Sequence, residues 1–135
     1  MKIEGTSHIS DQKDLLKSIG DIGGLDISAG LNYSGDAEDY LYALRTYADS
    51  VGDKANKLEE NLRDGKLEDY SLTVHSLKSM SKSIGANELH EMAKNLEAAG
   101  RSGDRETLDK DTPLFLELYR RLGTVLDERI PGDFE

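Results

Sequence analysis

From residue 36 to residue 64, apolar or small positions alternate with polar ones at steps of three and four residues. This spacing places the apolar side chains on one face of an α-helix over about six turns. Ser34 or Asp36 can cap the start of the helix, and Asp64-Gly65 can end it. The pattern predicts one long amphipathic helix, with inward positions at Leu41, Leu44, Ala48, Val51, Ala55, Leu58 and Leu62.

Two further segments repeat this pattern. The first covers residues 67–84 and ends at Gly85, which can adopt the left-handed conformation that closes a helix. The second starts at Ala86 or Asn87 and breaks at residues 100–103, which contain two glycines. The inward positions are Leu67, Tyr70, Val74, Leu77, Ser81 and Ile84 in the first, and Leu89, Met92, Leu96 and Ala99 in the second.

A fourth helix can start at Asp104 as its N-cap and continue to about Arg129. Pro113 lacks a backbone N–H, so we expect it to kink this helix or to restart it with Thr112 as a new cap. The predicted apolar stripe of this helix is Leu108, Phe115, Leu118, Leu122 and Val125.

The short connections between these segments favour antiparallel neighbours. The predicted fold is therefore all-α, an antiparallel up-and-down four-helix bundle with short extra N-terminal helices at residues 11–20 and 26–33. We expect residues 11–130 to form the bundle, residues 1–10 a flexible N-terminal segment and residues 131–135 a C-terminal tail. No large apolar stripe is left over, so a monomer is expected.

Composition narrows the possible functions. The chain has 135 residues, a formal charge of -10 and no cysteine. Thiolate metal sites and cysteine nucleophiles are excluded, and the acidity opposes binding to nucleic acid or to an anionic membrane. No apolar run is long enough for a membrane span or a signal peptide. Protein partners and a cytoplasmic location are the expectation.

His75 is the strongest candidate for chemistry. It follows the inward residue Val74, so its side chain is rotated by about 100° from the apolar stripe and reaches the edge of the buried face. Lys78, Ser79 and Lys82 follow at steps of three, four and seven residues, on the same side of the helix. A nucleophilic imidazole flanked by cations suits temporary storage of a phosphoryl group, and a polar rim residue is the alternative.

The other histidines and motifs do not indicate a metal site or a nucleotide site. His8 falls in the N-terminal segment, and His90 is expected to have a structural role. After His90-Glu91 no second histidine follows at the spacing of a zinc protease motif, and no Glu-x-x-His pair of a di-iron bundle is present. No phosphate-binding glycine loop is found either, so ATP binding is not expected.

The segment HSLKSMSKSIGANELHEMAKNLE, residues 75–97, resembles the signature of histidine phosphotransfer (HPt) domains of two-component phosphorelays. The matching positions are His75, Leu77, Lys78, Gly85, Ala86, Leu89, Leu96 and Glu97. Residues 24–44 resemble the entry of the family's bundle, and the likeness extends to about Arg129. One departure is Ser79, which stands where the family usually has glycine.

The resemblance implies that His75 accepts a phosphoryl group from a receiver-domain aspartate and passes it to another response regulator, with Lys78 near the phosphate. Glu97 would orient the imidazole. The implied partners are receiver domains of response regulators and a hybrid sensor histidine kinase. Such a carrier has no kinase activity and no cofactor of its own, because the receiver brings the magnesium ion.

Two alternatives stay open at this point. A helical adaptor without phosphotransfer would retain its partner when His75 is replaced by alanine. A dimeric histidine-kinase helix pair fits less well, because Ser76 stands where an acidic residue usually follows the histidine, and no proline lies nearby.

Overall fold

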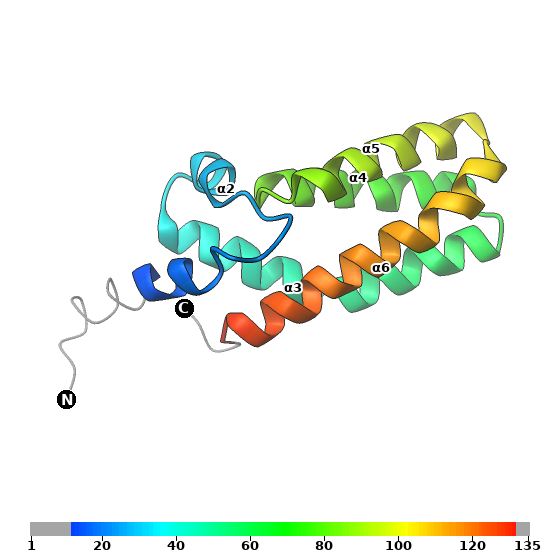
Figure 1. The fold of residues 1–135 in the computed structure, drawn as a ribbon. Helices are drawn as coiled ribbons and strands as arrows, with labels where there is room; N and C mark the ends of the chain where they lie inside the picture. Colours follow the sequence, from blue (N-terminus) through cyan, green and yellow to red (C-terminus); the bar gives the residue numbers. More distant parts are fainter. Residues whose placement is uncertain (1–11, 132–135) are drawn as a thin grey trace.

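The computed structural model describes residues 12–131, and every regular element within that range is a helix (Figure 1). Residues 12–18 are helical and precede five longer elements. These are α2 (Ile27–Ser34), α3 (Ala37–Arg63), α4 (Leu67–Ser83), α5 (Asn87–Ser102) and α6 (Arg105–Arg129). In Figure 1, α3 to α6 run alternately in opposite directions, joined by short turns. The predicted up-and-down four-helix bundle is therefore confirmed; residues 1–10 and most of the predicted tail lie outside the described residues.

Side-chain caps explain where the helices begin. Asp36 accepts a hydrogen bond from the backbone N–H of Asp39 at 2.8 Å and caps α3, whereas Ser34 is the last residue of α2. Asp104 caps α6 through the backbone N–H of Thr107 at 3.2 Å. Each carboxylate replaces a hydrogen bond that the first turn of a helix cannot make internally. Of the two caps expected for α3, Asp36 is the one used.

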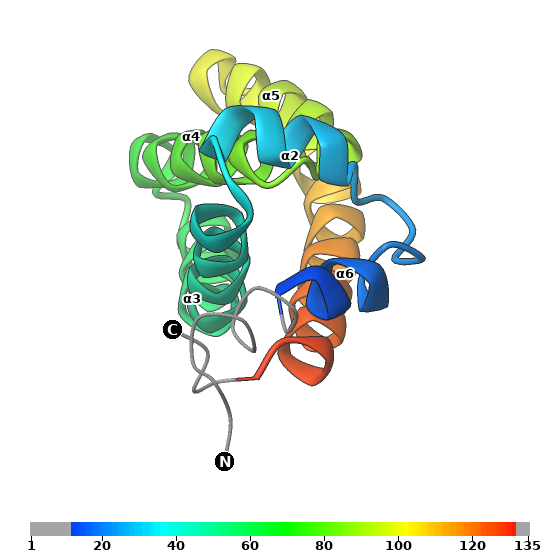
Figure 2. The ribbon, with the colours of Figure 1, turned by 90° about the vertical axis from the view of Figure 1, so that its left-hand side faces the viewer.

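Helix α2 packs across one end of the bundle, on the turn between α4 and α5 (Figure 2). Gly85 in this turn has φ of 83°, and a Cβ there would lie 2.0 Å from the carbonyl oxygen of Asp26. The backbone N–H of Asp26 donates to the carbonyl of Gly85 at 2.8 Å. Glycine is required here both for the positive φ and for the close approach of the two backbones. The turn thereby anchors the end of α4 and the start of α5.

Tyrosine hydroxyls tie the helices together inside the apolar core. Tyr47 of α3 is hydrogen-bonded to Ser81 of α4 at 2.9 Å, and Tyr70 of α4 to Thr112 of α6 at 2.6 Å. These four side chains are all buried. Because a buried hydroxyl without a partner is costly, each pair constrains how its two helices slide against one another. This fixes α4, which carries His75, against both α3 and α6.

Of the two effects expected of Pro113, a kink or a restart of α6, the restart is wrong. The helix is continuous through Pro113, and Thr112 is buried and bonded to Tyr70 rather than acting as a cap. Pro113 is exposed, and so is Asp109, four residues earlier. Because proline has no backbone N–H, the carbonyl of Asp109 loses its helical hydrogen bond, and its exposed position makes this loss less costly. Burial of Thr112 and Phe115 on the opposite side holds the helix together across the proline.

The inward face of α6 also differs from the predicted stripe in its C-terminal half. Leu118 and Val125 are half-buried, while the buried positions are Leu116, Tyr119 and Leu126 together with Leu122. The ring of Tyr119 meets that of Tyr47 edge-on, with centroids 5.5 Å apart. Residue 119, and not residue 118, therefore points to the core, where its ring packs against Tyr47.

Candidate functional site

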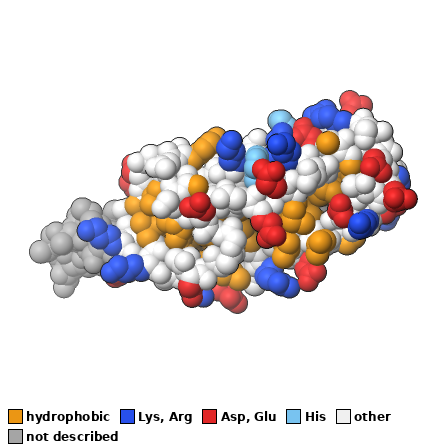
Figure 3. Space-filling view, turned by 45° about the horizontal axis from the view of Figure 1, so that its top comes forward, with side chains coloured by type: hydrophobic (Ala, Val, Ile, Leu, Met, Phe, Trp, Pro, Cys, Tyr) orange, Lys and Arg blue, Asp and Glu red, His pale blue; other side chains and the backbone are white. Residues whose placement is uncertain are grey.

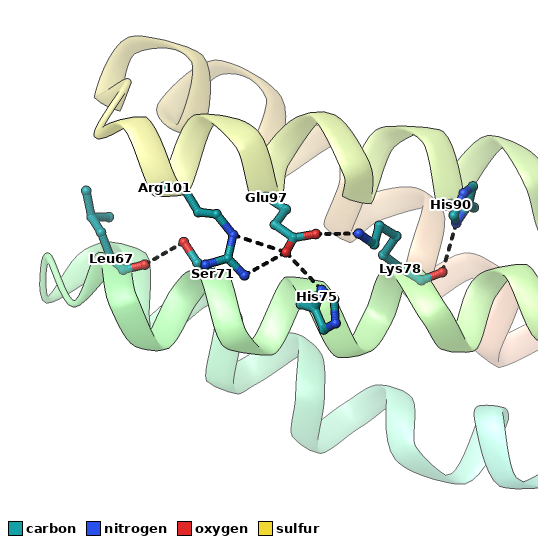
Figure 4. Close-up of polar contacts among 7 residues, drawn as sticks. All are labelled: Leu67, Ser71, His75, Lys78, His90, Glu97 and Arg101. Carbon is teal, nitrogen blue, oxygen red and sulfur yellow. Dashed lines mark hydrogen bonds and ion pairs between the residues drawn. The ribbon is translucent and has the colours of Figure 1, made fainter.

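His75 lies on the outward side of α4, with 52% of its side chain exposed, while the preceding Val74 is fully buried. Its Nδ1 lies 2.8 Å from Oε2 of Glu97 on the neighbouring helix α5 (Figure 4). The expected position at the edge of the buried face is therefore found. The ring is held from one side only.

Glu97 is the centre of this cluster, and only 10% of its side chain is exposed. Its Oε1 lies 2.7 Å from Nζ of Lys78. Its Oε2 accepts hydrogen bonds from His75 and from Nη2 of Arg101, the latter at 2.8 Å. Burial raises the pKa of Glu97, but the hydrogen bonds from Lys78, Arg101 and His75 outweigh it and lower the pKa to about 2. The carboxylate is therefore ionised at neutral pH.

The charge of Glu97 determines the tautomer of His75. An ionised carboxylate only accepts hydrogen bonds, so Nδ1 of His75 must carry the proton that lies between the two groups. In the neutral ring this leaves the lone pair on Nε2. The side chain is half exposed, and its Nε2 makes no hydrogen bond with the described residues, so this lone pair is accessible from the surface.

Both the side chain and the backbone of Lys78 make contacts with α5. Its ammonium pairs with Glu97, and its backbone carbonyl accepts a hydrogen bond from Nδ1 of His90 at 3.0 Å. The sequence predicts Lys78 on the same side of α4 as His75, and the structure adds that its charge pairs with the carboxylate that holds the ring. His90, with 19% of its side chain exposed, has the structural position expected for it.

Ser79 and Lys82 lie on the same outward side of α4 as His75, and both are exposed. Neither makes a hydrogen bond or an ion pair with His75 among residues 12–131. The structure therefore brings His75, Lys78 and Glu97 into contact, and within residues 12–131 Ser79 and Lys82 make no hydrogen bond or ion pair with these three. His8 falls outside the described residues.

Arg101 is a member of the cluster that the sequence analysis missed. It donates to Glu97 through Nε at 3.2 Å and Nη2 at 2.8 Å, and 56% of its side chain is exposed. Its position four residues after Glu97 on a helix is the signal that could have identified it. Figure 3 shows histidine side chains close to Lys and Arg side chains on this face of an otherwise acidic protein.

No group of three potential metal ligands is present among the described residues. Within the same range, no helix is long and apolar enough to cross a membrane. What the cluster offers is an oriented imidazole with cationic groups near it.

Comparison with known proteins gives one match. The family model of the Hpt domain matches residues 43–128, which include all of α4 and α5 and most of α3 and α6. No curated protein and no solved structure matches the chain. The matched segment contains every residue of the Glu97 cluster.

Proposed function

The chain belongs to the Hpt domain family, whose members carry out histidine phosphotransfer in phosphorelays, and we propose that His75 is its phosphoacceptor. In this proposal His75 takes a phosphoryl group from an aspartyl phosphate of a receiver domain and passes it to another response regulator. The observation that supports it is the exposed imidazole whose Nδ1 is held by the ionised Glu97, with Nε2 free.

The transfer would proceed by in-line attack of the Nε2 lone pair on phosphorus. The P–Nε2 bond forms while the bond from phosphorus to the aspartyl oxygen breaks, and the aspartate leaves as a carboxylate. The proton on Nδ1 stays in place, so the ring acquires a positive charge as the new bond forms. Glu97 accepts from that N–H and stabilises the developing charge. In the onward step a carboxylate oxygen of the second receiver's aspartate attacks phosphorus, the P–Nε2 bond breaks, and the ring leaves neutral with its proton still on Nδ1.

The cations have separate roles in this scheme. Lys78 and Lys82 offset the negative charge of the transferred group, with Lys78 leaving Oε1 of Glu97 or sharing its protons with a phosphoryl oxygen. Ser79 is small enough to leave room beside the ring and has a free hydroxyl to donate. Arg101 keeps Glu97 ionised and in place, which makes it a positioning residue.

Hpt domains are phosphocarriers rather than kinases, and they interact with receiver domains and histidine kinases. We infer that this chain has no kinase activity of its own and that a hybrid sensor histidine kinase stands upstream of its receivers. The magnesium ion would come with the receiver, since in-line positioning and charge neutralisation are what remains for this chain to supply.

The experiment is transfer of label from a magnesium-loaded, phosphorylated receiver domain to the wild type and to His75→Ala, scored as acid-labile phosphate. The control is His90→Asn, because the asparagine amide can replace Nδ1 of His90 as donor to the Lys78 carbonyl. We expect label on the wild type and on His90→Asn and none on His75→Ala. If a panel of receivers labels none of the three proteins, the phosphocarrier proposal fails and an adaptor role takes its place.

A further inference from the structure

Nε2 of His75 points away from α5, the helix that holds the ring. Nδ1 is bound to Glu97 on α5, and the two nitrogens of an imidazole point in nearly opposite directions. In Figure 4 the second ring nitrogen is directed away from Glu97, towards the side of α4 on which α3 lies. Helix α3 packs against α4. A phosphoryl group on Nε2 would therefore extend away from the Glu97 cluster, on the α3 side of the site.

Lys54 of α3 reaches this side of α4. Its Nζ lies 3.5 Å from Oγ of Ser76, the residue that directly follows His75. This contact is longer than an ordinary hydrogen bond and therefore weak. Lys54 is half-buried, and it makes no ion pair with residues 12–131. Its ammonium is thus held beside the phosphoacceptor, with no carboxylate of the described residues to neutralise it.

The other cations of the site are less available to a phosphoryl group. Lys78 and Arg101 both bind the carboxylate at the centre of the cluster. Lys82 follows the phosphoacceptor by seven residues, which places it about two turns, or about 10 Å, along α4. Lys54 differs from all three, because it comes from another helix and contacts the residue next to the phosphoacceptor without being engaged in an ion pair.

A phosphoryl group at Nε2 would meet an unfavourable field in this protein. It carries a charge of about -1.5 to -2 at neutral pH, and the chain has a formal charge of -10. The ionised Glu97 orients the ring, but its charge also repels the phosphoryl oxygens. A cation on the side opposite Glu97 offsets this repulsion without disturbing the hydrogen bond to Nδ1. Lys54 has that position.

We propose that Lys54 is a phosphate-binding residue of the His75 site, contributed by α3. Its ammonium exchanges the weak contact with Ser76 for a phosphoryl oxygen when Nε2 attacks phosphorus, since a lysine is a point charge on a flexible stem. It remains there while the phosphoryl group is on the ring. Lys54 acts through charge and hydrogen bonds and transfers no proton. The inference rests on the proposed function, because it requires a phosphoryl group at Nε2.

The test removes the charge of Lys54 and then restores it. Lys54→Gln removes the ammonium and keeps a good helix former, and Lys54→Arg retains a cation. Lys110→Gln is the control, since Lys110 is exposed on α6. Each protein is labelled by a phosphorylated receiver and, separately, by phosphoramidate, which transfers its phosphoryl group to histidine with loss of ammonia and needs no protein donor.

Phosphorus NMR of the labelled proteins gives a second readout. It measures the pH midpoint at which the phosphoryl group on His75 loses its last proton, and His75→Ala assigns the signal. We expect Lys54→Gln to slow labelling by both donors about fivefold and to raise the midpoint by about half a pH unit, because the dianion loses a neighbouring cation. Lys54→Arg and Lys110→Gln should stay within about twofold of the wild-type rates.

Two results would overturn the role of Lys54 while the phosphocarrier function stands. In the first, Lys54→Gln slows labelling by the receiver alone and leaves the midpoint unchanged, which would make Lys54 a contact of the receiver. In the second, Lys54→Gln changes neither the rates nor the midpoint. If phosphoramidate labels the wild type and no receiver does, the receiver-based function fails, and the phosphoramidate rates and the midpoints alone decide for or against Lys54.

Discussion

Among the ion pairs that link helices in residues 12–131, two groups are centred on a buried charge, and the two central charges have opposite signs. In the first, the buried guanidinium of Arg45 on α3 binds Asp49 at 2.7 Å, Asp127 on α6 at 2.5 Å and the carbonyl of Ile130 at 2.6 Å. In the second, the buried carboxylate of Glu97 binds His75, Lys78 and Arg101. In each network, one buried charge is compensated by oppositely charged or hydrogen-bonding partners that are themselves more exposed. Such pairing offsets the desolvation cost of the buried charge.

The sign of the central charge decides what the outer partners can do. Around Arg45 the outer groups are carboxylates, exposed to 66% and 70%, and they serve as acceptors. A buried guanidinium could hold an imidazole only through a lone pair, which would use up the nucleophile. A buried carboxylate holds it through an N–H and leaves the other nitrogen free. The Glu97 network can therefore present a nucleophile, whereas the Arg45 network is a structural clamp.

The largest difference between the two networks is expected when Arg45, the centre of the structural clamp, is replaced. Arg45→Met should lower the free energy of unfolding by about 2 kcal/mol, because the Ile130 carbonyl and both carboxylates lose a charged donor. Phosphotransfer per folded molecule should stay within about twofold of the wild type. Urea unfolding and receiver-dependent labelling measure the two quantities. If Arg45→Met slowed phosphotransfer without lowering the free energy of unfolding, Arg45 would affect the His75 site and would not be a purely structural residue.

At the Glu97 network, we expect the main effect of a substitution on phosphotransfer and a smaller effect on stability. Glu97→Gln should slow labelling by the receiver about tenfold or more, since a neutral amide stabilises the positive ring less and no longer requires the proton to be on Nδ1. Nitrogen NMR of the His75 ring gives an independent readout, with the Nδ1–H tautomer losing its dominance. If Glu97→Gln and the wild type had equal transfer rates and the same His75 tautomer, Glu97 would not orient the imidazole.

Stability measured against pH is the control for that variant. The pKa of Glu97 is lowered to about 2 in the folded protein, so its stabilising effect is complete above its ordinary pKa of 4.5 and is lost as the pH falls towards 2. The wild type should therefore be more stable than Glu97→Gln at neutral pH, by about 1 kcal/mol after screening at the exposed Arg101 and His75. The gap should close between pH 4.5 and pH 2. A constant gap would indicate a packing defect instead.

The smallest effect is expected at the periphery of the Glu97 network. Lys78→Ala should slow transfer about threefold to fivefold and change the free energy of unfolding by about 0.5 kcal/mol or less, because Arg101 still compensates Glu97. Rapid-quench labelling at saturating receiver resolves a change of this size. Lys110→Ala is the matched control, since Lys110 is exposed on α6 and has no role in the proposed transfer. If Lys78→Ala transfers at the wild-type rate, Lys78 does not act on the phosphate.

The helices were predictable because their signals are local. Steps of three and four residues, Asp36 and Asp104 as caps and Gly85 as a terminator all act within one or two turns. The sequence left open whether α6 restarts at Pro113, since the role of Thr112 depends on its hydrogen bond to Tyr70 on another helix. The choice between Leu118 and Tyr119 as the inward residue likewise depends on the ring of Tyr47.

The candidate site divides in the same way. The sequence by itself determined that His75 stands at the edge of an apolar stripe with Lys78, Ser79 and Lys82 on its side, because helical periodicity sets the direction of each side chain. Only the tertiary structure decided that Glu97 and Arg101 face them from α5, that Lys78 pairs with Glu97, and that Nδ1 is the bound nitrogen. These contacts join residues about twenty positions apart, and their distances follow from how α4 and α5 pack, a property that neither helix encodes alone.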